Sequence, residues 1–318
     1  MELGEFCSTS HVFIVAGKGG VGKTTVTAAL AAAAAGAGLS VLIVEVEGKS
    51  GIASMFDRPA LTYEEGQLAD GISARTLTPD EALVDYLVSH GLKRISRRLA
   101  SSGALDVVAT AVPGMRDILV LGKVKSIEES RAADVVILDA PAAGHAITFL
   151  LSPRGLLDAV KVGPVNKQAS DVVTMLSDPA RCQVLLVTIP EETPVNELVD
   201  TAYAIEDKVG VALGPVIVNG CYEPPAGGAE VTVDDVQRSA QMLDRFVSDR
   251  EAADLVLAAA FRAERHALQV EQAERLSQML PLPQIHLPFL FTAEIHRREV
   301  DQLATALTAG VASLPAHR

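Results

Sequence analysis

The sequence predicts an α/β fold in which helices cover both faces of a doubly wound, mostly parallel sheet. Short β-branched runs alternate with longer helical stretches along the chain, and the runs lack polar alternation, as expected of strands that are covered on both faces. The 318 residues are 49% hydrophobic but only 4% aromatic, with no Trp. An Ala-, Val- and Leu-rich composition suits helices packed on such a sheet, so we expect one elaborated domain over residues 1–318.

Six runs are predicted to be strands: 11–17 (HVFIVAG), 41–47 (VLIVEVE), 135–141 (VVILDAP), 182–190 (CQVLLVTIP), 214–220 (GPVIVNG) and 284–290 (QIHLPFL). Two regions depart from the simple alternation. Residues 78–127 and 231–279, approximately, have the amphipathic spacing of helices, and the turn-rich EPPAGGAE introduces the second. We interpret both as helical insertions that form a subdomain.

The charge and hydropathy of the chain disfavour several classes of partner. A formal net charge of -13 opposes a broad electrostatic interaction with phosphate backbones, so we expect no nucleic-acid partner. The most apolar helical run, 27–39, is mostly alanine and falls short of the roughly 20 apolar residues of a membrane span, so no transmembrane segment is expected. The N-terminus is acidic where a secretory signal is basic, which indicates a cytoplasmic protein.

The three cysteines, Cys7, Cys182 and Cys221, lie far apart and form no CxxC pair. Neither a disulfide framework nor a local zinc site is indicated, and buried or incidental thiols are the favoured interpretation.

Residues 17–25, GKGGVGKTT, directly follow the first predicted strand and open a helix, which is the context of a P-loop. The alternative is a glycine-rich structural turn, but the full motif in this context favours a phosphate site. Lys23 is expected to reach the β- and γ-phosphates of ATP or ADP, and the Thr24 hydroxyl to ligate Mg²⁺. The remaining nucleotide contacts are expected from backbone N–H groups of the loop and from its neighbours: Gly17, Gly19, Gly20, Val21, Gly22 and Thr25.

Lys18 is a second lysine, one residue into the loop. It is either a solvated surface lysine or a residue that crosses a dimer interface to the partner's nucleotide, where it would stabilise the transition state as an arginine finger does.

Asp139 ends a run of four apolar residues, the form of a Walker B element, and is expected to hold Mg²⁺ through water. A lone strand-end Asp is usually a cap, but the P-loop and the following PAAGH favour the functional interpretation. Gly144 and His145 are then expected in a switch loop that responds to the γ-phosphate.

Glu45 and Glu47 lie near the carboxyl end of the second predicted strand, where ligands bind in this architecture, and alternation places both on one face. We assign Glu47 to orienting or activating the attacking water and Glu45 to supporting the loop. A solvated acidic turn is the alternative for either.

Taken together, these segments resemble the ArsA-type ATPases, a family that includes the arsenite-pump ATPase and the eukaryotic ATPase that guides tail-anchored proteins to membranes. The resemblance spans most of the chain. In particular, the chain is similar to the paired bacterial members found in actinobacteria. The segments are GKGGVGKTT, VEVEGKSGIASMF, AVPGMRD, LDAPAAGHAITFL, VTIPEETPVNE, IVNG and LPFLFTAEIHR.

The resemblance implies roles for individual residues. Lys18 resembles the intermonomer signature lysine, Asp139 the switch II and Walker B aspartate, and Asn219 the asparagine that reads adenine. Pro288 and Phe289 resemble the segment that closes over the base.

Two positions depart from the family pattern. Glu47 stands where the family has Asp, which moves the carboxylate by about one methylene, and a misplacement near 1 Å can slow a reaction on the order of a hundredfold. Ala143 stands where the switch II stretch has Thr. The zinc-binding CxxC of the eukaryotic homodimer is missing, so no zinc is expected, and the clustered cysteines that arsenic(III) requires are missing too.

The resemblance implies an ATP-hydrolysing dimeric switch, a homodimer or a heterodimer with a paralogous ATPase, that couples nucleotide state to a helical subdomain binding an apolar or membrane-protein client. Three alternatives stay open: the energising subunit of an anion (arsenite) efflux system, a low-activity regulatory subunit of a heterodimer, and a partition or cell-division ATPase. Residues 104–121 are the candidate client groove, with ordinary core or oligomer interface as the alternative. Residues 93–98 (KRISRR) are a solvated face or a docking site.

Overall fold

The computed structural model describes residues 1–46, 51–89, 91, 114–224 and 231–315, and it confirms the α/β fold. Within those residues a single sheet of nine strands has the order β3-β4-β2-β5-β1-β6-β8-β9, with β7 paired to β6. Every pairing is parallel except that between β3 and β4. The strands are β1 Val12–Gly17, β2 Val41–Val46, β3 Gly66–Ala69, β4 Ile72–Leu77, β5 Val135–Ala142, β6 Cys182–Thr188, β7 Ala212–Leu213, β8 Val216–Cys221 and β9 Gln284–Pro288.

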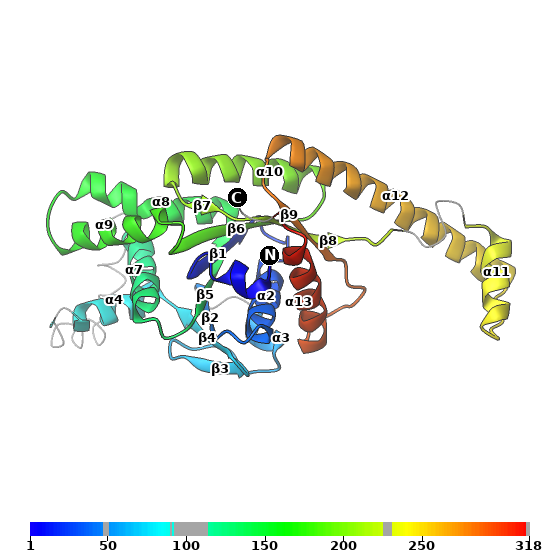
Figure 1. The fold of residues 1–318 in the computed structure, drawn as a ribbon, viewed down its shortest axis with the longest axis horizontal. Helices are drawn as coiled ribbons and strands as arrows, with labels where there is room; N and C mark the ends of the chain where they lie inside the picture. Colours follow the sequence, from blue (N-terminus) through cyan, green and yellow to red (C-terminus); the bar gives the residue numbers. More distant parts are fainter. Residues whose placement is uncertain (47–50, 90, 92–113, 225–230, 316–318) are drawn as a thin grey trace.

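Helices cover both faces of the sheet (Figure 1). One face carries α1, α2, α3 and α13, and the other carries α7, α8, α9 and α10, so two apolar cores flank the strands. The helices are α1 Leu3–Cys7, α2 Lys23–Gly36, α3 Ile52–Met55, α4 Pro79–Ser89, α7 Met115–Ser130, α8 Ala143–Ala159, α9 Pro164–Ser177, α10 Glu192–Ala204 with the π-turn η1 Ile205–Val209, α11 Val233–Met242, α12 Asp249–Met279 and α13 Arg297–Ala312.

All six predicted strands are present, but the prediction missed β3, β4 and the two-residue β7. β3 and β4 form an antiparallel hairpin at the edge of the sheet, joined at Asp70 and Gly71, where Gly71 has φ +73°. Burial in β4, the second strand from this edge, alternates over its first four residues, because strands near the edge are covered less evenly than the central strands. Searching only for uninterrupted apolar runs therefore overlooked it, although an Asp-Gly pair between alternating segments is a hairpin signal.

The described parts of the two predicted helical ranges contain α4, most of α7, α11 and α12; residues 90 and 92–113 lie outside the described part. Capping boxes start both α11, at Thr232, and α12, at Ser248. Figure 1 shows α12 running outward from the sheet, with α11 at its far end. We call α11 and α12 together the arm. That these helices form a subdomain of a single domain remains a prediction.

None of the helices in the described chain is long and apolar enough to cross a membrane.

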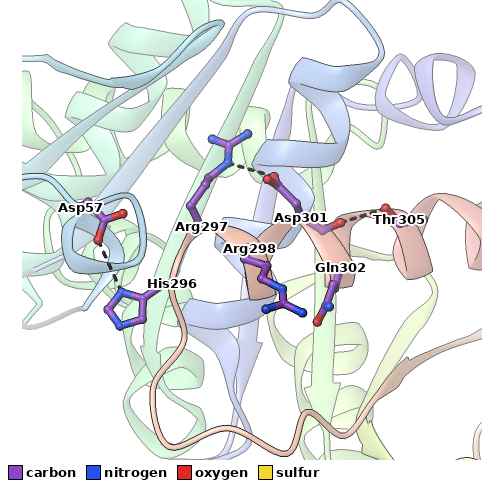
Figure 2. Close-up of a pocket in the computed structure, with 7 residues that line it drawn as sticks. All are labelled: Asp57, His296, Arg297, Arg298, Asp301, Gln302 and Thr305. Atoms are coloured by element: carbon purple, nitrogen blue, oxygen red, sulfur yellow. Dashed lines mark hydrogen bonds and ion pairs between the residues drawn. The ribbon is translucent and has the colours of Figure 1, made fainter.

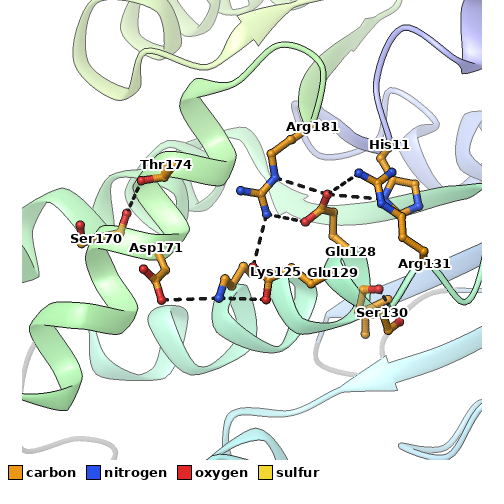
Figure 3. A network of polar contacts seen from close by, with 11 residues as sticks. His11, Lys125, Glu128, Glu129, Ser130, Arg131, Ser170, Asp171, Thr174 and Arg181 are labelled. Atoms are coloured by element: carbon orange, nitrogen blue, oxygen red, sulfur yellow. Dashed lines mark hydrogen bonds and ion pairs between the residues drawn. The ribbon is translucent and has the colours of Figure 1, made fainter.

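A buried ionic network lies at the amino-terminal ends of β1 and β6 (Figure 3). The predicted phosphate loop follows the opposite, carboxyl end of β1. The Glu128 side chain is 2% exposed and accepts hydrogen bonds from the Arg181 guanidinium, while Arg131 lies 3.3 Å and His11 3.6 Å from its Oε1. Burial alone would raise the pKa of Glu128, but the hydrogen bonds from Arg181 and the nearby positive charges lower it overall. Because His11 and Arg181 directly precede β1 and β6, the network connects α7 to two central strands.

Candidate functional site

The predicted phosphate loop lies between the end of β1 at Gly17 and the start of α2 at Lys23. Gly20 and Gly22 have φ of +86° and +89°, a region that residues with a side chain rarely adopt. A Cβ on Gly17 would lie 2.3 Å from the Val187 carbonyl oxygen, and one on Gly22 2.3 Å from Asn219 Nδ2. The Val21 side chain is buried and anchors the loop from inside. The glycines therefore allow both the backbone turn and its close approach to the neighbouring strands.

Lys23 begins α2 and points back over the loop. Its Nζ donates a hydrogen bond to the Lys18 carbonyl oxygen at 3.0 Å. Partial burial lowers the pKa of Lys23, and the nearby Asp139 carboxylate raises it. The ammonium thus lies at a helix N-terminus whose backbone N–H groups also favour an anion.

Thr24 and Asp139 lie in direct contact. The Thr24 hydroxyl donates to Asp139 Oδ2 at 2.9 Å, and the Thr27 hydroxyl lies 3.4 Å from Oδ1. Asp139 is 7% exposed, and burial raises the pKa of its carboxyl from the ordinary 3.8 to about 6. The two hydroxyls and Lys23 act against this shift, whereas the negative charge of Glu45 adds to it.

Glu45 lies beside Asp139 because β2 and β5 are neighbours in register, with Glu45 opposite Asp139. Its side chain is buried and accepts a hydrogen bond from the Thr76 hydroxyl at 3.0 Å. Two buried carboxylates and a threonine hydroxyl thus line one end of the phosphate loop. Such a set of oxygen donors is what a hard divalent cation prefers, and its excess negative charge is what a cation would neutralise.

Lys18 forms an ion pair within its own chain. Its Nζ donates to Glu197 Oε1 of α10 at 2.6 Å, and the two side chains are 39% and 45% exposed. The predicted intermonomer lysine is therefore at the surface of the described chain, beside the loop.

Asn219 lies near the end of β8, which β6 separates from β1 in the sheet, and its side chain reaches the phosphate loop. Its Nδ2 donates to the Val21 carbonyl oxygen at 2.9 Å. Pro288 ends β9 opposite Cys221, and the Phe289 N–H donates to the Cys221 carbonyl oxygen at 2.8 Å. The predicted base-binding residues thus come from two neighbouring strand ends, next to the loop.

Comparison with known proteins decides the family. The family model described as anion-transporting ATPase (ArsA ATPase) matches residues 10–163. The ATPase BagA of Mycobacterium tuberculosis is 33% identical over 300 residues, which cover 87% of each chain. The chain belongs to the ArsA ATPase family. Other relatives are a putative arsenical pump-driving ATPase of Halobacterium salinarum, 24% identical over 69% of this chain and 36% of that protein, and the ATPase get3 of Neurospora crassa, 29% identical over 48% of this chain and 46% of that protein.

Sequence reasoning missed an aromatic cluster that includes Phe289, one of the residues predicted to close over the base. Phe289, which is 43% exposed, packs against Tyr222 and Phe291 with ring centroids 5.0 Å and 4.9 Å away. In a chain with only 4% aromatic residues, two Phe residues spaced two apart at a strand end were the available signal. Glu197, the partner of Lys18, could not be identified from the sequence, because it is far from the loop along the chain and only the packing of α10 places it there.

The prediction that Gly144 and His145 lie in a loop was wrong, while a response of this segment to the γ-phosphate remains a prediction. β5 continues to Ala142 and α8 begins at Ala143, so both residues lie in the first turn of α8. The physical reason is the helical spacing of the apolar residues that follow, Ala146, Phe149 and Leu150, which are buried in the core.

The structure also bears on the predicted client groove, residues 104–121. Its first part, 104–113, lies outside the described residues, as do residues 93–98 and Glu47. In the described remainder, Ile118, Val120 and Leu121 are buried in the core of the sheet. That part of the segment is therefore core, the alternative interpretation given above, and offers no apolar groove.

The thiols of this family member are dispersed, as predicted. Burial raises the pKa of the Cys7 thiol to about 12 and that of Cys221 to about 11, and it also raises the pKa of Cys182. Across the described parts of the chain no group of three or more His, Cys, Asp or Glu side chains is placed to hold a metal ion.

A separate concave surface of about 700 Å³ lies beside α13 and includes none of the predicted site residues (Figure 2). His296 there contacts Glu294 at 3.1 Å and Asp57 at 3.4 Å. The hydrogen bond to Glu294 and the charges of both carboxylates raise the pKa of this exposed imidazole. The contact to Asp57 connects the segment after α3 to the N-cap of α13.

Proposed function

We propose that this ATPase is a dimeric, ATP-dependent switch in which Lys23, Thr24 and Asp139 bind magnesium nucleotide and Lys18 acts on the nucleotide of the partner subunit. The proposal rests mainly on one observation: directly after the phosphate loop, the Thr24 hydroxyl donates a hydrogen bond to Asp139 Oδ2 at 2.9 Å. Family membership supports ATP as the ligand.

The residues present fit a magnesium nucleotide. The loop from Gly17 to Gly22 has no room for a Cβ at its two ends, so its backbone N–H groups are free to approach phosphate oxygens closely. Lys23 supplies a point charge for the β- and γ-phosphates, and Thr25 follows in the first turn of α2. Thr24 would exchange its hydrogen bond to Asp139 for the cation, and Asp139 would hold the cation through water. Bound MgATP supplies the reaction itself, the transfer of its γ-phosphoryl group to water.

A divalent cation at this site would neutralise the buried negative charge of Asp139 and Glu45. The pKa of Asp139 is raised because burial and the negative charge of Glu45 outweigh the two threonine hydroxyls and the Lys23 ammonium, so the ionised carboxylate is poorly stabilised. A divalent cation would restore the ionised form. Cation binding and the ionisation of Asp139 are therefore expected to be coupled.

Lys18 supports a two-subunit arrangement. Its ammonium lies at the surface and is held by an ion pair that is too exposed to contribute more than about 1 kcal/mol. Exchanging Glu197 for a phosphate of a neighbouring subunit is therefore inexpensive. In this proposal each chain supplies both a nucleotide site and the lysine that acts on the opposing site, so two copies related by a two-fold axis would be sufficient. A paralogous ATPase is the alternative partner.

Turnover depends on Glu47 in this proposal. Glu47 would orient or activate the attacking water, but its arm is one methylene longer than the Asp that the family resemblance implies. We therefore expect slow hydrolysis, on the order of a hundredfold below that of an optimally placed carboxylate.

The base of the nucleotide is proposed to lie between Asn219 and the segment of Pro288 and Phe289, where an aromatic cluster is exposed. Phe289, Phe291 and Tyr222 present flat apolar surface at the strand ends, which suits stacking on a purine. Asn219 would supply the polar contact, since an amide can both donate to and accept from a base edge.

We propose that the arm contacts an apolar protein client or partner. Large apolar side chains are exposed on the two helices and on the segment that joins them: Met242, Leu243, Phe246, Leu257 and Phe261, with Phe246 at 92%. Exposed apolar surface of this kind marks interaction sites on soluble domains. The dispersed thiols do not favour an arsenical substrate, which is what the name of the Halobacterium relative indicates for that protein.

The test of the nucleotide site compares Lys23→Ala with Lys18→Ala. Lys23→Ala is expected to abolish ATP binding, measured by titration calorimetry, because it removes the charge on the β- and γ-phosphates. Lys18→Ala is expected to retain binding within a few-fold and lose turnover, because its charge acts only in the transition state. Wild-type protein that binds ATP without ever hydrolysing it would remove the catalytic part of the proposal.

The test of the client is photo-crosslinking of an apolar transmembrane peptide, with and without ATP. Phe246→Ser and Phe261→Ser are expected to reduce the adduct, whereas Val162→Ser, which changes another exposed apolar side chain, is expected not to. A yield independent of both nucleotide and the arm variants would contradict client binding by the arm.

A further inference from the structure

Helix α12 buries one polar side chain, that of Gln269, although most of the helix is exposed. Gln269 is 7% exposed, and the other buried residues of α12 are Ala252 and Leu276. A glutamine amide has two donors and an acceptor, and removing it from water is unfavourable unless these are satisfied.

The amide of Gln269 is satisfied by the backbone of one turn at the end of β8. Its Nε2 donates to the Gly220 carbonyl oxygen at 3.0 Å, and its Oε1 accepts from the Tyr222 N–H at 2.7 Å. The side chain thus occupies both polar groups on one side of the turn, as a neighbouring strand would. Gly220, with φ +73°, lies where the register of β8 on β9 shifts, between Val218 and Cys221, and this irregular strand end is what we call the turn.

This turn connects the two halves of the proposed base site. Asn219 precedes it and donates to the Val21 carbonyl oxygen of the phosphate loop at 2.9 Å. Tyr222 ends it and packs against Phe289 and Phe291, with ring centroids 5.0 Å and 5.8 Å away. Displacing the turn would move the polar contact and the aromatic surface together.

We propose that Gln269 is a positioning residue for the base of the nucleotide, holding Asn219 and Tyr222 in the arrangement that binds it; this rests on the proposed function. Gln269 need not contact the nucleotide itself. It reduces the ordering that the turn must undergo on binding, which is how preorganisation increases affinity.

The same clamp connects the base site to the arm. Arg262 lies seven residues before Gln269, about two helical turns, and therefore on the same face of α12. Its guanidinium lies 4.9 Å from the centre of the Phe291 ring, so a second contact from α12 reaches the aromatic cluster. Base binding and the position of the arm are consequently coupled, and the coupling acts in both directions.

The test is Gln269→Leu in the full chain, which keeps the size of the side chain and removes both hydrogen bonds. Binding of ATP and of inorganic tripolyphosphate, which has no base, is measured by titration calorimetry. We expect ATP affinity to fall roughly tenfold and tripolyphosphate affinity to stay unchanged, because two hydrogen bonds of ordinary strength position only the base end. The matched control is Gln278→Leu, on an exposed turn of the same helix, which is expected to change neither.

Equal losses for ATP and tripolyphosphate, or an ATP affinity within twofold of wild type, would overturn the assignment. A second measurement on wild-type protein covers the case in which the variant does not fold. Hydrogen exchange at the Tyr222 N–H and along 262–269 is expected to slow more with ATP than with tripolyphosphate, and equal slowing would also overturn it. Failure of the wild type to bind ATP at all would instead count against the proposed function.

Discussion

Replacing Asp139 with Asn is predicted to have opposite effects on stability and on magnesium-dependent nucleotide binding. The buried carboxyl has a folded-state pKa of about 6 against an ordinary value of 3.8, so the folded protein binds its proton more tightly than the unfolded chain does. Ionisation of Asp139 therefore costs stability. The cost is absent below about pH 4, develops as the pH rises towards 6, and is complete above that value.

The size of the effect follows from the shift. A difference of about two pKa units corresponds to about 3 kcal/mol at neutral pH, because each unit is about 1.4 kcal/mol. Asparagine has nearly the same shape and retains an oxygen that can accept the Thr24 hydroxyl, but it carries no charge. We predict that Asp139→Asn raises the free energy of unfolding at pH 7.5 by on the order of 2 kcal/mol, allowing for some loss of hydrogen-bond strength.

The assay is urea unfolding of the nucleotide-free protein from pH 5.5 to 8, in parallel with titration of Mg²⁺ in the presence of ATP. The variant is expected to be the more stable protein throughout and to have lost the magnesium-dependent part of ATP binding. Asp134→Asn is the control, because hydrogen bonds from Ser40 lower the pKa of that exposed carboxyl and neutralising it is expected to give no gain in stability. An Asp139→Asn variant that is less stable than wild type at pH 7.5 would refute the reasoning.

Three further predictions concern the phosphate loop, the Glu128 network and His296. Gly22→Ala should destabilise the protein by about 1 to 3 kcal/mol in a thermal-shift assay and abolish ATP binding in calorimetry, because it combines backbone strain with a close contact to Asn219. The control is Gly38→Ala, at φ +88° with no atom within 4 Å of the added Cβ. It introduces the strain alone and should retain ATP binding. Glu128→Gln should lower the free energy of unfolding at pH 7 by about 3 kcal/mol in urea unfolding, because it breaks a buried ion pair. The difference should be full above the ordinary value of 4.5 and disappear as the pH falls through the lowered folded-state pKa. The half-exposed Glu129→Gln should stay within about 0.5 kcal/mol of wild type. The pKa of His296, measured by NMR titration, should lie above its ordinary 6.5. Its contacts with Glu294 and Asp57 stabilise the fold at low pH and are lost as the pH rises through that raised pKa, and a midpoint at or below 6.5 would contradict them.

Much of the fold followed from the sequence because its central strands are uninterrupted apolar runs. β1, β2, β5 and β6 are buried along nearly their whole length, and such strands leave an unambiguous pattern. The β3–β4 hairpin could not be recognised in the same way, since its burial is set by which neighbours happen to cover the edge. The switch loop at Gly144 failed for a related reason: a motif indicates chemistry, whereas the packing of Ala146 and Phe149 decides where the helix begins.

The parts of the candidate site that are contiguous in the sequence could be predicted. The parts that the fold brings together from distant segments could not. The phosphate loop is contiguous, so its glycines and Lys23 could be assigned from spacing alone. The pairing of Glu45 with Asp139, and of Lys18 with Glu197, depends on strand order and on where α10 packs. No local pattern around Gln269 distinguishes it from the other glutamines of the same helix, Gln272 and Gln278, and only its contacts with the end of β8 do so.

The most direct test of the central claim, that Lys18 serves the nucleotide of a second subunit, is the ATPase rate of a mixture. Lys18→Ala and Lys23→Ala proteins are each expected to be inactive, and a 1:1 mixture allowed to exchange subunits is assayed at the same total concentration. If Lys18 acts across the interface, half of the dimers contain one working site, and the mixture should recover about a quarter of the wild-type rate. A mixture that stays as inactive as its two components would contradict the claim.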